Sequence, residues 1–275
     1  MSNKVTVVKG ERSVETVLRA LSLVDFKAAL KGWDRVLIKV NFITTKTWDT
    51  GATTDPLVVE ALLQRLRELP VEVFIVESDA TVTNADKAFV ATGMRDLSFE
   101  YDVEFINLRY APDQIKIEIP DKLTLSSIKV PRIVTESAII SAAKMKTHSE
   151  TNVTLGLKNM FGILPQKFKG RYHLRGMHKV ITDINSVVKP VFTVIDGFIA
   201  MEGRGPVNGV PIKMDTIIAG ADPVATDAVG AQVMGFDPES IAHIKMSHEK
   251  GIGNLYDYTV VGDGIDVVRR NFRRR

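Results

Sequence analysis

Short runs of β-branched and other apolar residues alternate along the chain with longer stretches of helical periodicity. Several runs, such as residues 73–76 and 191–195, are almost entirely apolar, which is typical of strands covered on both faces. The pattern predicts strands at residues 5–8, 35–40, 71–76, 103–106, 138–142, 191–195, 216–219 and 258–261, and helices at residues 14–30, 56–69, 153–161, 177–187, 223–234 and 238–249. This alternation predicts an α/β fold with a mainly parallel sheet and helices on both faces.

Residues 110–135 interrupt the alternation of strands and helices. The segments 115–119 and 123–130 alternate between apolar and polar residues as half-exposed strands do, with one break at residues 126–127, and Pro120 and Pro131 follow them. We therefore expect an inserted antiparallel excursion beside the main sheet around residues 110–135.

The charged residues are unevenly distributed. The chain has 275 residues with 36 Lys and Arg against 33 Asp and Glu, and five of the arginines lie in residues 269–275. Without them the chain is slightly acidic, which argues against a large nucleic-acid surface. The sequence indicates one α/β domain over residues 1–268 and a basic tail, Arg269–Arg275. We expect the tail to be a disordered cationic end that binds nucleic acid or an acidic partner only weakly.

The absence of cysteine excludes whole classes of site. A chain without Cys cannot form disulfides, hold a Cys-ligated zinc or ligate an iron–sulfur cluster through thiolates. It also fits a reducing compartment. No window approaches the roughly 20 apolar residues of a membrane span, and the first apolar stretch is too short for a signal peptide. These features predict a cytoplasmic protein without a membrane partner.

Polar side chains follow several predicted strands at the point where each strand ends. Asn41 follows residues 35–40, Glu77-Ser78-Asp79 follows residues 71–76, and Asp196 follows residues 191–195. Because the carboxyl ends of parallel strands meet at one edge of a sheet, where ligands of such folds bind, we expect these groups to converge.

The densest polar segment is Lys144-Met145-Lys146-Thr147-His148, which is predicted as a loop after residues 138–142. Thr154 and Lys158 follow at helical spacing and share a face of the next predicted helix. Ammonium groups, hydroxyls and a helix N-terminus together favour phosphate or carboxylate. The alternative is a solvated loop whose lysines contact nothing.

Each of the other candidate residues has a structural interpretation as well as a functional one. Asp196 is a metal ligand, a base or orienting carboxylate, or the end of a strand in an Asx turn. The Asp-Pro pairs at residues 55–56 and 222–223 predict helix starts. Asp222 is favoured as a helix cap, whereas Asp227 could orient a lysine or bind metal. His173 lies in a basic loop that could close over the anion site or remain solvated. The glycine-rich residues 203–209 form either a lid or a surface connection. The five-residue spacing within the pairs His173/His178 and His243/His248 argues against zinc.

The sequence resembles a widespread bacterial and archaeal family known as domain of unknown function 362. The resemblance runs in order over residues 35–255 and rests on Leu-Ile-Lys-Val-Asn (37–41), Thr-Thr-Asp-Pro (53–56), Ala-Lys-Met-Lys-Thr-His (143–148), Leu-Lys-Asn-Met-Phe-Gly (157–162), Ile-Asp-Gly (195–197), Gly-Arg-Gly-Pro (203–206) and Ala-Asp-Pro-Val-Ala-Thr-Asp-Ala (221–228). It implies site residues at Lys39, Asn41, Lys144, Lys146, His148, Lys158, Asn159, His173, Asp196 and Asp227. Many relatives add a ferredoxin-like cluster domain, which implies a redox setting that this chain could share only with a partner.

Two functions follow as expectations. The first is an enzyme or cofactor-binding protein that acts on a small phosphate- or carboxylate-bearing metabolite. Lys39, Asn41, Lys144, Lys146, Lys158 and Asn159 would bind the anion, His148 or His173 would act as acid or base, and Asp196 and Asp227 could hold a divalent metal. The alternative is a non-catalytic redox or assembly partner of an iron–sulfur protein.

Overall fold

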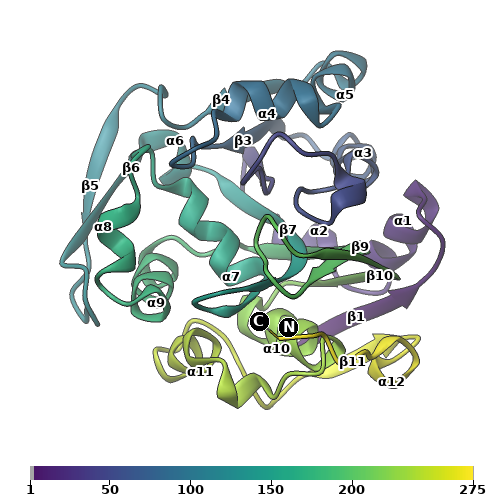
Figure 1. The fold of residues 1–275 in the computed structure, drawn as a ribbon. Coiled ribbons are helices and arrows are strands. Elements are labelled where there is room, and N and C mark those ends of the chain that lie inside the picture. Colours follow the sequence, from purple (N-terminus) through teal and green to yellow (C-terminus); the bar gives the residue numbers. More distant parts are fainter. Residues whose placement is uncertain (1–2, 275) are drawn as a thin grey trace.

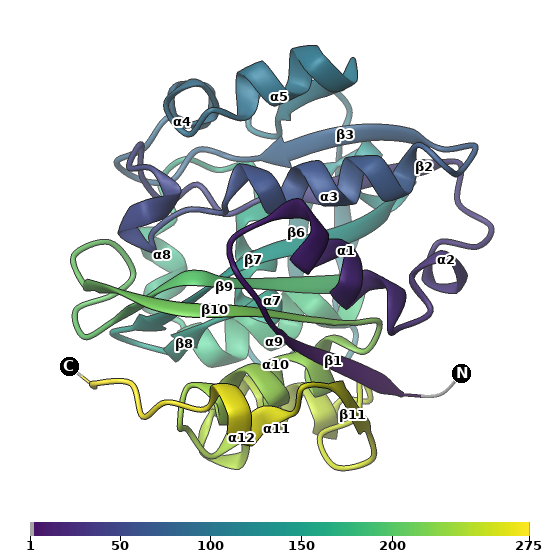
Figure 2. The same ribbon diagram turned by 90° about the vertical axis from the view of Figure 1, so that its right-hand side faces the viewer.

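A computed structural model describes residues 3–274, which fold around one nine-stranded sheet (Figure 1). Eight strands cross the sheet in the order β11 (Thr259–Gly262), β1 (Lys4–Lys9), β10 (Val210–Gly220), β9 (Phe192–Glu202), β7 (Ala138–His148), β2 (Arg35–Lys39), β3 (Glu72–Glu77) and β4 (Glu104–Asn107). The ninth, β8 (Asn152–Thr154), pairs with β7. In Figure 2 the strands lie one above another, from β3 near the top to β11 at the bottom.

The sheet is mainly parallel, as predicted. The pairs β11–β1, β9–β7, β7–β2, β2–β3 and β3–β4 are parallel. Only β10, which runs against both β1 and β9, and the short β8 are antiparallel to their neighbours within residues 3–274. All eight predicted strands are present, although β7, β9 and β10 are each several residues longer than predicted.

Helices cover both faces of the sheet, which confirms the predicted fold class. The N-terminal helices contribute to one core, namely α1 (Val14–Ser22), α2 (Phe26–Ala29), α3 (Pro56–Leu66), α4 (Ala85–Ala91) and α5 (Met94–Tyr101). The later helices contribute to the other, namely α6 (Arg132–Thr135), α7 (Gly156–Asn159), α8 (Gly170–His173), α9 (Met177–Val187), α10 (Pro223–Val233), α11 (Ala242–Glu249) and α12 (Ile265–Val268). Figure 2 shows α1 and α3 in front of the sheet with α7, α9 and α10 behind it. No helix within residues 3–274 combines the length and hydrophobicity that a membrane crossing needs.

The two cores follow from alternation along the strands. On β2, Val36 and Ile38 belong to the first core and Leu37 to the second, because successive side chains of a strand point to opposite faces. Three short 3₁₀ helices complete the fold, η1 (Trp48–Thr50), η2 (Met160–Ile163) and η3 (Pro238–Ser240).

Two helices begin where an Asp-Pro pair predicted a start. The carboxylate of Asp55 accepts a hydrogen bond from Leu57 N at 3.0 Å, and Asp222 caps α10 in the same way. In both helices proline occupies the first turn, where its missing N–H costs nothing. The interpretation of Asp222 as a cap is therefore confirmed.

The antiparallel excursion is also present. Strands β5 (Gln114–Glu118) and β6 (Ser127–Pro131) pair as a separate two-stranded sheet. Asp183 of α9, which is buried, fixes the turn between them because its carboxylate accepts 2.7–2.8 Å hydrogen bonds from three successive backbone N–H groups, those of Leu123, Thr124 and Leu125.

The structure corrects three of the predicted elements. Residues 144–148 are not a loop but the last part of β7, and all eleven residues of this strand are buried. Residues 14–30 form two helices, α1 and α2, and residues 153–161 form β8, α7 and η2 instead of one helix. The glycine-rich residues 203–209 connect β9 to β10 as a hairpin.

The expectation of a disordered tail is wrong for residues 269–274. Phe272 is only 5% exposed, and its backbone N–H donates to Met234 O. Arg273 donates to the buried carboxylate of Glu202 from its backbone N at 2.9 Å and from Nε at 2.6 Å. A buried phenylalanine and a buried carboxylate thus attach this segment to β9 and α10.

Candidate functional site

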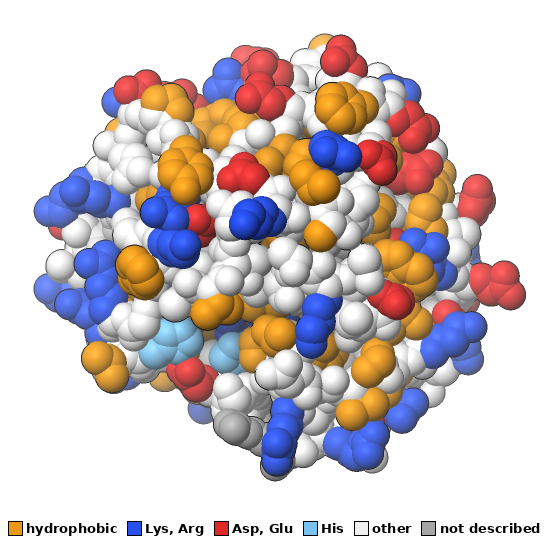
Figure 3. Space-filling view, turned by 45° about the horizontal axis from the view of Figure 1, so that its top comes forward, with side chains coloured by type: hydrophobic (Ala, Val, Ile, Leu, Met, Phe, Trp, Pro, Cys, Tyr) orange, Lys and Arg blue, Asp and Glu red, His pale blue; other side chains and the backbone are white. Residues whose placement is uncertain are grey.

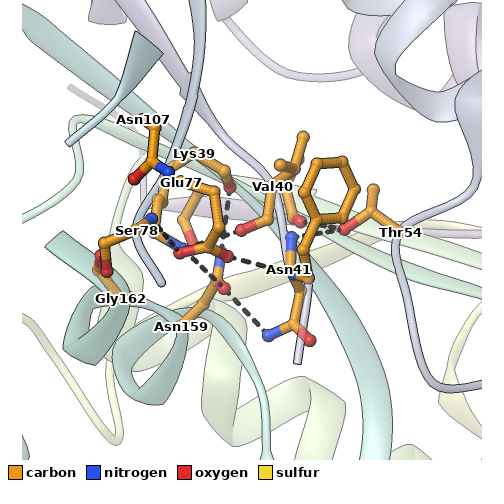
Figure 4. A network of polar contacts seen from close by, with 12 residues as sticks. Lys39, Val40, Asn41, Thr54, Glu77, Ser78, Asn107, Asn159 and Gly162 are labelled. Atoms are coloured by element: carbon orange, nitrogen blue, oxygen red, sulfur yellow. Dashed lines mark hydrogen bonds and ion pairs between the residues drawn. The ribbon is translucent and has the colours of Figure 1, made fainter. Parts of the chain in front are cut away.

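A buried ion pair joins the ends of β2 and β3. Lys39 Nζ lies 2.8 Å from Glu77 Oε1, and Glu77 also accepts backbone hydrogen bonds from Phe42 and Ser78 (Figure 4). Burial lowers the pKa of Lys39, and the charge of Glu77 acts against this shift. Gly162 of η2 packs on the pair so closely that a Cβ there would lie 2.4 Å from Lys39 Nζ. Only glycine fits this position without displacing the lysine.

Asparagine side chains extend this pair into a network across neighbouring strands. Asn159 Nδ2 donates to Lys39 O at 2.9 Å and to Ser141 Oγ at 3.1 Å, and its Oδ1 accepts from Asn41 Nδ2 at 2.9 Å (Figure 4). Asn41 Oδ1 in turn accepts from Lys146 Nζ at 2.8 Å. The predicted convergence of polar groups from β2, β3 and β7 is therefore present.

A second buried ion pair joins β7 to β9. Lys144 and Asp196 occupy facing register positions, and Lys144 Nζ lies 2.7 Å from Asp196 Oδ2. The same carboxylate accepts backbone hydrogen bonds from Asp55 at 2.8 Å and Phe198 at 3.2 Å. Asp196 lies inside β9, not after it, and both of its oxygens have protein partners. It therefore positions the strands and the start of α3.

Two adjoining pockets of about 230 and 260 Å³ open beside the lysine network. Their shared lining includes Asn41, Thr154, Lys158, Phe161 and His173. The first pocket adds Lys39, Glu77 and Lys169, and the second adds Lys146, His148 and Glu150. On the face drawn in Figure 3, histidine side chains reach the surface, Lys and Arg lie on the left and along the lower part, and Asp and Glu lie mainly at the top and right.

The lysines at these pockets outnumber their carboxylate partners. Within residues 3–274, Lys158 Nζ has neither an ion pair nor a hydrogen bond, and Lys169 Nζ donates only to Ser78 Oγ at 2.7 Å. Burial lowers the pKa of each to about 8. Burial, and then the neighbouring lysines, also hold the pKa of Lys146 well below its usual value. An anion placed here would stabilise the charged form of these lysines and so raise their pKa values again.

The hydroxyl group of Thr154 also lacks a hydrogen-bond partner among the described residues. Thr154 is among the residues that line both pockets, and its buried Oγ1 has no hydrogen-bond partner within residues 3–274. Such a group normally finds one, because leaving it unpaired costs about 1–3 kcal/mol. The prediction that Thr154 and Lys158 share a helix face is wrong, because Thr154 belongs to β8 and Lys158 to α7.

The two predicted histidines differ in what they can do. His148 Nδ1 accepts hydrogen bonds from the backbone N–H groups of Glu150 and Thr151, and burial lowers its pKa to about 2. His148 is therefore neutral at physiological pH and a poor base. His173 lies at the surface with Nδ1 2.7 Å from Glu150 Oε1. A carboxylate in this position orients the ring and leaves Nε2 for proton transfer.

Asp227 acts on the backbone that carries Lys158. Its carboxylate accepts hydrogen bonds from Gly156 N at 2.7 Å and Leu157 N at 2.9 Å, at the start of α7. Burial raises its pKa to about 7. Asp196 and Asp227 thus each hold other parts of the chain, and no group of three or more His, Asp or Glu side chains within residues 3–274 is arranged to hold a metal ion. A divalent metal remains without structural support.

Three residues of the site were missed as candidates. Glu77 was placed at the polar edge by its position after an apolar run, and Lys169 belongs to the basic loop around His173. Both signals were visible in the sequence. Glu150, the partner of His173, had no such signal because 23 residues separate the two.

The fold and site define an α/β protein with a lysine-lined pocket at the carboxyl edge of its sheet. The chain belongs to the family described as domain of unknown function (DUF362), whose sequence profile matches residues 36–232. It is also similar to a thylakoid-associated protein of Synechocystis, with 28% identity over 232 residues that cover 81% of this chain and 70% of the relative. The family resemblance seen in the sequence is confirmed.

Proposed function

We propose that the protein binds a small phosphate- or carboxylate-bearing metabolite in the two adjoining pockets, as an enzyme or a cofactor-binding protein. The observation that carries the proposal is the ammonium group of Lys158, which has no carboxylate partner within residues 3–274 and lines both pockets. Lys146, Lys169 and the unpaired hydroxyl of Thr154 add donors around it. Charge-assisted hydrogen bonds from such groups are the ordinary means of binding phosphate and carboxylate.

Proton transfer is the chemistry that this arrangement supports best. The Glu150–His173 pair lines the second pocket, beside the proposed position of the anion. His173 Nε2 would then exchange a proton with the ligand while Glu150 holds the ring in place. His148, being neutral, would donate a hydrogen bond from Nε2 to the same ligand.

The test is a calorimetric titration of the full chain with inorganic phosphate, sulfate and acetate. Replacing Lys158 with Gln should weaken binding of the anion that binds best by about 10- to 100-fold, the size of one hydrogen bond to a charged group. Lys179→Gln, on the exposed side of α9, is the matched control and should change nothing. Equal affinities in the wild type and Lys158→Gln would overturn the proposal.

The iron–sulfur partner and the cytoplasmic location remain separate proposals. No contact within residues 3–274 favours docking to an iron–sulfur protein, so this alternative gains weight only if none of the three anions binds. The cytoplasmic location likewise stays a prediction, and the name of the relative from Synechocystis gives it no support.

A further inference from the structure

The pocket that contains Lys39 and Lys169 has apolar as well as charged lining residues. Its apolar lining comes from four segments that are distant in the sequence, namely the loop after β2, the loop after β3, η2 and the β9–β10 hairpin. The apolar side chains are Phe42, Ile43, Val82, Phe161, Pro206 and Val207. Val82 is 90% exposed, and Ile43, Phe161, Pro206 and Val207 are half-buried. A site for a bare inorganic anion would not need such a wall.

The ring of Phe161 lies beside the charged groups. Its centroid is 5.8 Å from Lys158 Nζ and 5.6 Å from Lys169 Nζ. A ligand whose anionic group contacts these ammonium groups therefore places its remaining atoms next to this ring. Aromatic side chains prefer flat or apolar partners there, because stacking and burial both contribute.

The carboxylate in this pocket is not available to a ligand. Among the described residues, 3–274, Glu77 is the only Asp or Glu that lines it, and both oxygens of Glu77 are engaged by Lys39 and by backbone N–H groups. Ser78 Oγ is similarly engaged, by Gly162 O and Lys169 Nζ. The lining thus offers little to a cationic ligand and favours one with a single anionic group.

We infer that the ligand carries its phosphate or carboxylate on an apolar body about the size of an aromatic ring, which lies against Phe161 and the β9–β10 hairpin. This inference rests on the proposed function and specifies its ligand class. The volume agrees, since the pocket of about 230 Å³ exceeds the roughly 150 Å³ cavity that suffices for benzene. We place the anionic group at Lys158, which has neither an ion pair nor a hydrogen bond within residues 3–274 and lines both pockets together with Thr154.

Two pairs of probes test the inference on the full chain. Inorganic phosphate is compared with phenyl phosphate, and acetate with benzoate, by calorimetric titration. In the pair whose anionic group the site prefers, the probe with the ring should bind at least about tenfold more tightly than the probe without it. That pair also distinguishes a phosphate ligand from a carboxylate ligand.

Variants locate the ring. Phe161→Ala should reduce the gain from the ring to about threefold or less, and Val82→Ser, a change at an exposed position that leaves the core intact, should reduce it in part. Phe99→Ala is the matched control, because Phe99 is 76% exposed on α5 and does not line the pocket. It should leave the gain unchanged.

The outcomes separate the two proposals. If phosphate or acetate binds but the ring adds nothing, the ligand class is wrong and the proposed anion site stands. An equal gain in Phe161→Ala and the wild type would also overturn the inference. If none of the four probes binds, both proposals fail together.

Discussion

Burial brings the ammonium groups of Lys158 and Lys169 close to deprotonation at ordinary pH. The pKa of each is lowered from 10.5 to about 8, so both lose their charge as the pH rises through this value. A bound anion stabilises the charged form and therefore requires protonated lysines. We expect affinity to fall as the pH rises through about 8, not through the usual range of lysine.

Sulfate is the suitable probe, because its own charge is constant in this range. Its affinity should fall by less than about twofold between pH 7 and 7.5 and decline steadily above about 8, with uptake of protons on binding that calorimetry in buffers of different ionisation enthalpy detects. Lys158→Gln should show a shallower decline, since the site then has one titrating lysine fewer. Affinity that stays flat up to pH 10 would contradict this prediction.

For single residues, the sequence predicted where the polar side chains lie but not which groups they contact. The rule that polar groups follow parallel strands placed Asn41, Lys144 and Lys146 at one edge, and the family resemblance added Lys39. Whether a lysine has a carboxylate partner depends on residues that are distant in the sequence, such as Asp196 for Lys144. No local sequence pattern shows which lysines are paired. The difference between a lysine with a carboxylate partner and one without became visible only in the structure.

The short helix α7 depends on a carboxylate from another helix. It has four residues, too few for a stable isolated helix, and its first two N–H groups donate to Asp227 of α10. Asp227→Ala should therefore destabilise the protein by about 2–5 kcal/mol, because two buried donors lose their acceptor. Urea denaturation measures this loss.

Asparagine at the same position provides the graded comparison. Asp227→Asn keeps one acceptor oxygen, so we expect about half the loss of the alanine variant. Both variants should also weaken anion binding, since α7 carries Lys158. Wild-type stability and affinity in Asp227→Ala would show that α7 is positioned by other contacts.

Elements were predictable where their own residues determine them. Long apolar runs and Asp-Pro starts gave the sheet, α3 and α10, whereas α4 and α5 were missed because they have only seven and eight residues and Gly93, at φ +82°, separates them. The lysines of β7 resemble a solvated loop in the sequence. They lie in a strand because Asp196 and Asn41 satisfy their ammonium groups.

The last residues of the described chain contribute to the stability of the whole molecule. Removing residues 269–275 exposes the surface that Phe272 covers and leaves Glu202, which is buried in β9, without Arg273. We expect a loss of about 3 kcal/mol or more, from lost apolar burial and an unpaired carboxylate. Thermal and urea denaturation check it.

Two point variants divide the effect. Phe272→Ser should reproduce a large part of the loss, whereas Arg269→Ala, at an exposed side chain, should change stability by less than about 0.5 kcal/mol. A truncated protein as stable as the wild type would restore the expectation of a disordered tail. The weak nucleic-acid binding predicted for these arginines remains to be measured on the same variants.

The attachment of the tail also has a practical consequence for producing the protein. Gly203, at the start of the β9–β10 hairpin, donates its N–H to Arg273 O, and Pro206 and Val207 of the same hairpin line the first pocket. We expect a purification tag fused behind Arg275 to disturb the contact between Arg273 and Gly203, and with it the hairpin residues that line the pocket. In Figure 2 the two chain ends lie on opposite sides of the molecule. Tags, surface immobilisation and fluorescent labels therefore belong ahead of β1, where they leave the pocket undisturbed.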